Sequence, residues 1–188
     1  LATVHAQLKP VEMNPVDAIW TDQPTPPATA AVPHSLNFTG KTSAEKREAL
    51  AAELVKNDLK AQVLNQSESV AWLLNVRGDD IEGLPVARSF ATLHDTGAVD
   101  WYIAPDRVSE AMHQTLDNQV AIFHPDEMPA RLGLISGAVG LDFKTCNAAM
   151  ANALKAGGAV VKNNTDPVVL PRAIKNETEQ QGARDAQR

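Results

Sequence analysis

The sequence predicts an α/β fold in which a mixed β-sheet of about six strands is flanked by helices. Short apolar runs of strand character alternate with stretches of helical periodicity, and this alternation is typical of α/β domains. Two neighbouring strand-like runs are joined by a short connection that contains glycine, which predicts a β-hairpin and makes part of the sheet antiparallel. We expect residues 1–35 to form a linker, residues 36–166 the domain itself, and residues 167–188 an exit segment.

The predicted linker is rich in proline, including Pro24, Pro26, Pro27 and Pro33. Each proline fixes its own φ angle and lacks an N–H donor. We therefore expect neither a regular helix nor a central strand in this segment, but an extended connector on the surface of the domain.

A capping box opens the first expected helix, because Thr42 can accept a hydrogen bond from the Glu45 amide while the Glu45 side chain reaches back. This helix should run to about Asp58, with a partly apolar stripe at helical spacing. The short run Ala61–Leu64 is then the first expected strand.

The apolar run Val70–Leu74 is predicted to be a second, buried strand. It is short, begins with a β-branched residue and is bounded by polar segments, all of which favour a strand. Residues 65–69 are the expected polar turn that leads into it.

The remaining elements continue the alternation of strands and helices. Residues 89–93 and 99–103 are the expected strands of the hairpin. After them we expect a helix that is capped by Asp106 and carries Val108, Met112 and Leu116 inward. A strand at 120–123, a short helix at 127–132 and a strand at 138–141 should follow. The last elements are a helix capped by Thr145 and ended by Gly157 and Gly158, and a strand at 159–162.

Four polar residues, Asn75, Arg77, Asp79 and Asp80, follow the run Val70–Leu74 directly. Ligands of open α/β sheets collect beyond the carboxyl ends of the strands, so these side chains are candidates for lining a cleft. Arg77 is the best of them, because its planar guanidinium suits a peptide carbonyl or carboxylate. The alternative is a purely structural turn, in which the aspartates accept local amide hydrogen bonds and Arg77 pairs with one of them.

Composition limits the function classes that fit. A chain of 188 residues, 44% of them hydrophobic, can build one core, and its net charge of −6 argues against a nucleic-acid partner. The longest apolar run is far shorter than the roughly 18 residues that a membrane span needs. One cysteine and no recognisable signal peptide predict a cytoplasmic protein. Because the chain begins at Leu1 rather than Met, we expect it to be part of a longer one.

The stretch WLLNVRGDDIEGLPV, followed by SFATL, resembles the middle domain of the cytosolic three-domain Xaa-Pro aminopeptidases (aminopeptidase P), in the pita-bread metallopeptidase superfamily. NPVDAIWTDQPTPP is similar to that family's interdomain linker, and PVVLPRAIKNETEQQGARDAQR to its exit into the catalytic domain. The resemblance implies a creatinase/prolidase N-terminal-like fold. It also implies that a polar last helix, begun by Asn176 and Glu179, continues into a catalytic domain that this chain lacks.

In that family two divalent metal ions, usually manganese, activate a water in the catalytic domain and polarise the Xaa-Pro carbonyl. Their ligands are two aspartates, one histidine and two glutamates, and the motifs that carry them do not occur in this sequence. The segment 124–127 comes nearest, but a surface turn capped by Asp126 explains it better. Cys146 lies on an apolar stripe and is interpreted as a small core residue.

The sequence therefore predicts no catalytic residue, metal ligand or cofactor in this chain, and its histidines His5, His34, His94 and His113 stand without partners at ligand spacing. The expected function is that of a non-catalytic middle domain. Its parent would release the N-terminal residue from peptides with proline second, bind its own catalytic domain and form a homodimer. Two alternatives stay open: an interaction module of a pita-bread relative that has lost its metals, and an unrelated α/β domain that binds a small molecule.

Overall fold

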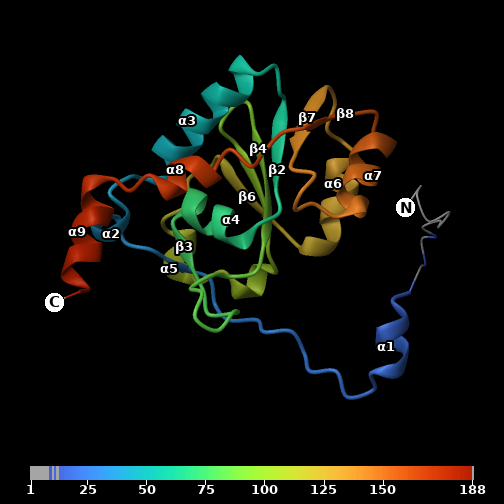
Figure 1. Ribbon diagram of the computed structural model, residues 1–188, viewed down its shortest axis with the longest axis horizontal. Helices are drawn as coiled ribbons and strands as arrows, with labels where there is room; N and C mark the ends of the chain where they lie inside the picture. Colours follow the sequence, from blue (N-terminus) through green and yellow to red (C-terminus); the bar gives the residue numbers. More distant parts are fainter. Residues whose placement is uncertain (1–8, 10, 12, 188) are drawn as a thin grey trace, which may run out of the picture.

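The computed structural model describes residues 9, 11 and 13–187. At its centre is a six-stranded sheet in the order β6-β5-β4-β2-β7-β8 (Figure 1). The pairs β2–β4 and β4–β5 are antiparallel and the other three pairs are parallel, which confirms the predicted mixed sheet and the hairpin. The strands are β2 (Ala61–Leu64), β4 (Phe90–His94), β5 (Val99–Tyr102), β6 (Val120–Phe123), β7 (Ala138–Leu141) and β8 (Val160–Asn163).

Helices cover both faces of this sheet (Figure 1). Successive side chains of a strand point to opposite faces, so Val63 and Leu64 of β2 enter two different hydrophobic clusters. The cluster of Leu64 packs against α3 (Ser43–Lys56), α4 (Ser67–Leu74) and α5 (Glu110–His113), whereas that of Val63 packs against α6 (Met128–Leu132) and α7 (Ala148–Ala156). In the part of the chain that the structure describes, no helix is long and apolar enough to cross a membrane.

The run Val70–Leu74 is helical, so its prediction as a strand is wrong. It forms the buried end of α4, and Ser67 and Glu68, expected in a turn, form the first turn of that helix. A short apolar run does not by itself distinguish a buried strand from a buried helix. The usual start signal is also missing here, because Gln66 precedes α4 without a side-chain capping bond.

The helix expected from Asp106 is interrupted. A 3-10 helix, η2 (Pro105–Arg107), comes first, and α5 begins only after its own cap, Ser109. Between them Val108 is extended and forms a β-bridge with Ala31. This contact joins residues distant in sequence, so local capping signals could not reveal it, although Val108 is buried as predicted.

Two helix starts also differ from the prediction. Asn147, rather than Thr145, caps α7, and its side chain accepts a backbone amide at 3.0 Å. The amide of Thr145 is instead held in a turn by the carbonyl of Asp142. His124, rather than Asp126, caps the 3-10 turn η3 (Pro125–Glu127) that precedes α6, because its ring nitrogen accepts the Asp126 amide at 3.3 Å.

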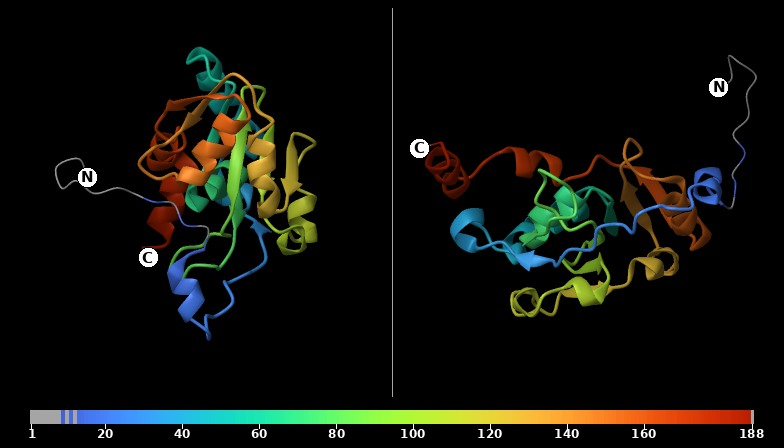
Figure 2. Two further views of the ribbon diagram at one scale, coloured as in Figure 1. Left: turned by 90° about the vertical axis from the view of Figure 1, so that its right-hand side faces the viewer. Right: turned by 90° about the horizontal axis from the view of Figure 1, so that it is seen from below.

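The proline-rich segment before residue 35 contains more regular structure than predicted. Pro15 begins a short helix, α1 (Pro15–Ile19), at the first position, where the missing N–H costs nothing. This helix projects from the body of the molecule (Figure 2). Further along, Ala31 is fully buried and β1 (Val32–Pro33) pairs with β3 (Val76–Arg77) in a separate two-stranded sheet.

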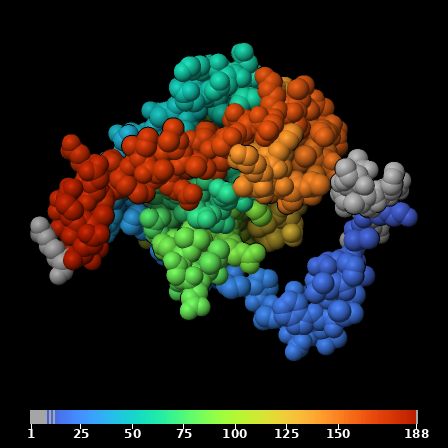
Figure 3. Space-filling view, in the orientation of Figure 1, coloured from blue at the N-terminus to red at the C-terminus, as the bar shows by residue number. Residues whose placement is uncertain are grey.

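The exit segment runs through α8 (Val169–Ala173) to α9 (Glu177–Asp185), which stands at the opposite end of the molecule from α1 (Figure 3). The predicted cap of α9 is confirmed, since Asn176 and Glu179 form a reciprocal capping box. None of its residues is buried. Its attachment to the body is through α2 (Leu36–Thr39), where the Asn176 side chain donates to the Thr39 carbonyl at 2.8 Å.

We expect the amides of α9 to exchange with solvent rapidly and those of Val70–Leu74 slowly. Ordering a residue costs about 1–2 kcal/mol, and α9 has no buried apolar face to offset this cost. Residue-resolved hydrogen exchange on the isolated chain checks the expectation. Equal protection of the two helices would show that α9 packs more firmly than its contacts with α2 indicate.

Candidate functional site

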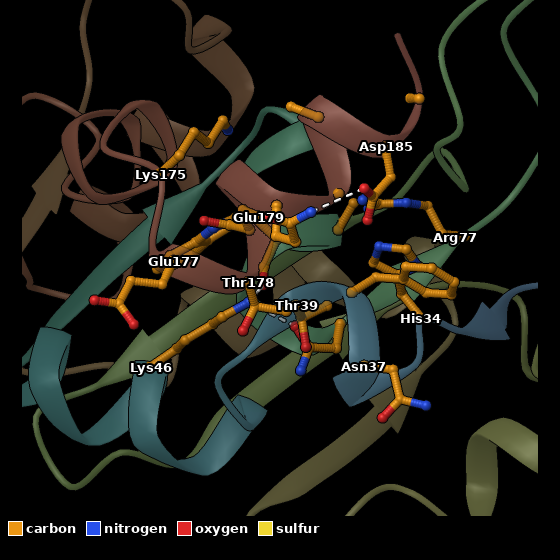
Figure 4. A pocket seen from close by; sticks show the side chains of 18 residues that line it. His34, Asn37, Thr39, Lys46, Arg77, Lys175, Glu177, Thr178, Glu179 and Asp185 are labelled. Carbon is orange, nitrogen blue, oxygen red and sulfur yellow. Dashed lines mark hydrogen bonds between the residues drawn. The ribbon is translucent and has the colours of Figure 1, made fainter. Parts of the chain in front are cut away.

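An open cleft of about 960 Å³ separates α9 from the body of the domain (Figure 4). We name it the α9 cleft. Its body side is formed by α2, the end of α4 and β3, and its other side by α9 and the residue before its cap. Most of its lining is apolar, with charged groups from both sides, as in ligand-binding clefts generally. Its polar lining residues include His34, Lys46, Asn75, Arg77, Glu179 and Asp185.

The structure brings two of the four predicted residues, Asn75 and Arg77, into this cleft. Asp79 and Asp80 are not among its lining residues and belong to the loop between β3 and β4. The four residues follow the end of a helix, α4, rather than the carboxyl end of a sheet strand. The cleft therefore lies at the margin of the helical layer and not at the sheet edge that was expected.

Asn75 is the C-cap of α4 and joins three separate segments. Its backbone adopts the left-handed conformation, with φ 52° and ψ 47°, which asparagine tolerates better than most residues. Its side-chain amide donates to the Lys41 carbonyl at 2.8 Å, and its side-chain oxygen accepts from Lys46 Nζ at 2.6 Å. Its carbonyl accepts the His34 amide at 2.7 Å, at the entrance to the β1–β3 pair.

Lys46 was missed by the sequence analysis, although it is only 4% exposed. It lies on α3 in the same stripe as Leu50 and Leu54, at the spacing of four residues that places side chains on one helix face. Burial lowers its pKa to about 8, against the partial opposition of Glu179. A polar residue in register with an apolar helical stripe was the signal that could have found it.

Arg77 extends from β3 along the body side of the cleft, and Figure 4 shows it beside Asp185 of α9. Burial lowers the pKa of its guanidinium, and the nearby charge of Glu179 partly counters the effect. The alternative prediction paired Arg77 with Asp79 or Asp80. Asp80 instead forms its ion pair with Arg107.

Asp80 holds together the loop between β3 and β4. Its fully buried side chain accepts the amide and hydroxyl of Thr29 at 2.9 and 2.7 Å, the Arg88 amide at 2.6 Å, and a bond from the Arg107 side chain. Burial alone would raise the pKa of Asp80, but these hydrogen bonds outweigh it and lower the pKa. Asp80 thus joins this loop to Thr29 and Arg107, which are distant in sequence, rather than closing a local turn with Arg77.

An aromatic pair flanks the charged part of the cleft. The rings of His34 and Phe38 are stacked, with centroids 5.6 Å apart and planes 12° from parallel. Burial lowers the pKa of His34, and the positive charges of Arg77 and Lys46 lower it further. The stacked His34 ring and the exposed Phe38 ring give this part of the cleft an aromatic surface.

The arrangement can bind and orient a polar group, but it does not fit a metal centre. Among the described residues, no cluster of three or more histidine, cysteine, aspartate or glutamate side chains could hold a metal ion. A dinuclear site requires several such ligands around each pair of ions. The metal ions implied by the family resemblance therefore have no binding site among these residues.

Comparison with known proteins agrees with this structure. Residues 22–179 match the Creatinase/Prolidase N-terminal domain family. The chain is 32% identical over 184 residues to the probable Xaa-Pro aminopeptidase P of Aspergillus niger, covering 93% of this chain and 30% of that protein. It is 30% identical over 188 residues to that of Leptosphaeria maculans, covering 95% and 31%. The chain thus spans less than a third of the length of these relatives.

Solved structures give the same result. The X-prolyl aminopeptidase of Caenorhabditis elegans, described as a cytosolic enzyme with a di-nuclear active site, aligns with a TM-score of 0.83 and 26% identity. The alignment covers 93% of this chain and 29% of that one. The prolidase of Pyrococcus horikoshii shares the fold alone, with a TM-score of 0.53 and 18% identity over 73% of this chain. By the match over residues 22–179, the chain belongs to the creatinase/prolidase N-terminal domain family.

Proposed function

We propose that this chain is the non-catalytic middle domain of an Xaa-Pro aminopeptidase, an enzyme that removes the first residue from peptides with proline second. The carrying observation is that aminopeptidase relatives match the chain over 93% of its length, while the chain spans only 30% of theirs. In this proposal residues 1–35 connect the domain to a preceding one. Residues 36–166 form its body, and residues 167–188 lead into the catalytic domain.

The α9 cleft would then be the surface at which the domain meets the catalytic domain and its peptide. One observation supports this role. Arg77 and Asn75 present a guanidinium and an amide along one side of an apolar-lined cleft, and a planar guanidinium suits a peptide carbonyl or carboxylate. Asp79 and Asp80 would serve this surface indirectly, through the loop that carries them.

The rest of the machinery would lie outside this chain. The catalytic domain would supply the ligands of two divalent metal ions, for which we propose manganese. The family resemblance further implies a homodimeric, cytoplasmic parent. The description of the C. elegans relative as a cytosolic enzyme with a di-nuclear site supports the compartment and the number of metals.

We expect the isolated chain to hydrolyse no Xaa-Pro peptide, because none of the described residues form a cluster that could hold a metal ion. The measurement is release of arginine from Arg-Pro-Pro with excess manganese, compared with a protein-free blank. Repeated turnover above that blank by the purified chain would contradict the assignment of catalysis to another domain.

A further inference from the structure

Lys46 is a buried lysine whose two hydrogen-bond acceptors are both uncharged. Its Nζ donates to the Trp72 carbonyl at 2.9 Å and to the Asn75 side-chain oxygen at 2.6 Å. The same ammonium lies 4.3 Å from the centre of the Trp72 ring. Burying an ammonium is costly, and these three contacts hold it in a directional arrangement that an apolar side chain could not form.

Both acceptors belong to the C-terminal end of α4. The last carbonyls of a helix lack partners within the helix and carry a partial negative charge. Lys46 supplies a donor and a positive charge to the Trp72 carbonyl, and it also fixes the side chain of Asn75, the left-handed cap. A residue of α3 therefore contacts the chain at the point where it leaves α4.

From Asn75 the backbone continues directly into β3. The Asn75 carbonyl accepts the His34 amide at 2.7 Å, and in the next residues β3 pairs with β1, with Val32 opposite Arg77. The turn at Asn75 thus lies directly before the short strand from which the Arg77 side chain extends into the cleft.

We propose that Lys46 is a positioning residue of the α9 cleft, which sets the backbone course from Asn75 to Arg77 and hence the place of the Arg77 guanidinium. Lys46 acts through these residues rather than by contacting a ligand. The inference deepens the proposed function, since it takes the cleft as the working surface, but the geometry that it describes exists in the isolated chain.

The charged groups around Lys46 come from every neighbouring segment. Burial is the largest influence and disfavours its charged form. Glu179 of α9 opposes burial, whereas Arg77 of β3, Lys41 before α3 and Lys175 before α9 add to it. The pKa of about 8 lies below the usual value of 10.5. A neutral amine retains two donors, so both hydrogen bonds survive deprotonation. Deprotonation does remove the positive charge over the Trp72 ring, so Trp72 reports the protonation state of Lys46.

The linkage to stability has a definite sign. Because the pKa of Lys46 is lower in the folded than in the unfolded state, the unfolded chain binds more protons between about pH 8 and 10.5. The contribution of Lys46 to the free energy of unfolding therefore rises with pH across that window. The free energy of unfolding of the wild type minus that of Lys46→Met should therefore increase as the pH is raised from about 8 to 10.5.

The experiment uses the chain as it stands, with Lys46→Met, Asn75→Ala and, as a matched control on the same helix, the exposed Lys56→Met. Residue-resolved hydrogen exchange compares the His34 amide, bonded to the Asn75 carbonyl, with the Leu93 amide in β4. Loss of a hydrogen bond from a charged donor should speed exchange at His34 by about tenfold or more relative to Leu93. Lys56→Met should leave this ratio unchanged.

Equal acceleration at His34 and Leu93 in Lys46→Met would show that Lys46 only fills the core and would overturn the proposal. If that variant does not fold, Lys46→Gln, which is shorter and uncharged, decides by the same ratio, and Asn75→Ala shows how large the change in that ratio becomes when the cap itself is lost. The wild type gives an independent result: the Trp72 indole NMR signal should titrate with a midpoint near 8. No titration between pH 7 and 10 would contradict the placement of the ammonium. These readouts do not involve peptide hydrolysis, so they stand or fall apart from the proposed function.

Discussion

Replacing Asp80 by alanine should lower the free energy of unfolding by about 3–5 kcal/mol, the usual cost of removing one partner of a buried ion pair. The change leaves the Arg107 guanidinium, whose side chain is only 12% exposed, without its carboxylate. It also leaves the amides of Thr29 and Arg88 without their acceptor. Denaturant unfolding of the isolated chain measures the effect.

Asp79→Ala is the matched control, since the neighbouring side chain is exposed and a change there should stay within about 0.5 kcal/mol. The effect of Asp80→Ala should also depend on pH. Because the folded pKa of Asp80 is lowered, its contribution is fully present above the usual aspartate value of about 4 and is lost as the pH falls through the folded pKa. A gap between wild type and variant that persists below that range would contradict the account.

Replacing Arg77 by alanine in the full-length parent should lower turnover of Arg-Pro-Pro while leaving folding nearly intact. A directional hydrogen bond from a charged donor is typically worth about 1.5–3 kcal/mol, or roughly 10- to 150-fold in rate when it is made only in the transition state. Steady-state kinetics and a thermal melt of the same variant separate the effect on catalysis from that on stability.

Arg77→Lys is the informative control, because it keeps the charge but loses the planar fork. If Arg77 contacts the peptide, lysine should restore little of the turnover. If it only pairs with a carboxylate at the surface, the alanine variant should lose less than about 1 kcal/mol, and the loss should appear in stability. Unchanged turnover with a slightly lowered melting temperature would show that Arg77 does not contribute to catalysis.

The elements that the sequence predicted correctly are those whose signals are local. The capping boxes of Thr42 with Glu45 and of Asn176 with Glu179 lie within four residues and are found as expected. The hairpin of β4 and β5 is predictable for the same reason, since its strands are adjacent and its turn contains Gly97 with φ 85°. Some errors occur where a tertiary contact decides, as at Val108, which bridges Ala31, and others where the local signal is ambiguous, as at Val70–Leu74.

The candidate site was predictable only in part. Asn75 and Arg77 line a cleft, but they follow a helix, whereas the prediction placed them after a strand at Val70–Leu74. Their neighbour Lys46 is separated from Asn75 by 29 positions, and its role depends on how α3 packs against α4. Nothing in the order of residues around Asp80 identifies Arg107 as its partner.

The most direct test of the central claim is peptide hydrolysis by the full-length protein that contains this chain. The account predicts that it releases arginine from Arg-Pro-Pro in the presence of manganese and stops when the metal is removed by a chelator, whereas the isolated chain is inactive under both conditions. A full-length protein that leaves Arg-Pro-Pro intact with manganese present would contradict the account.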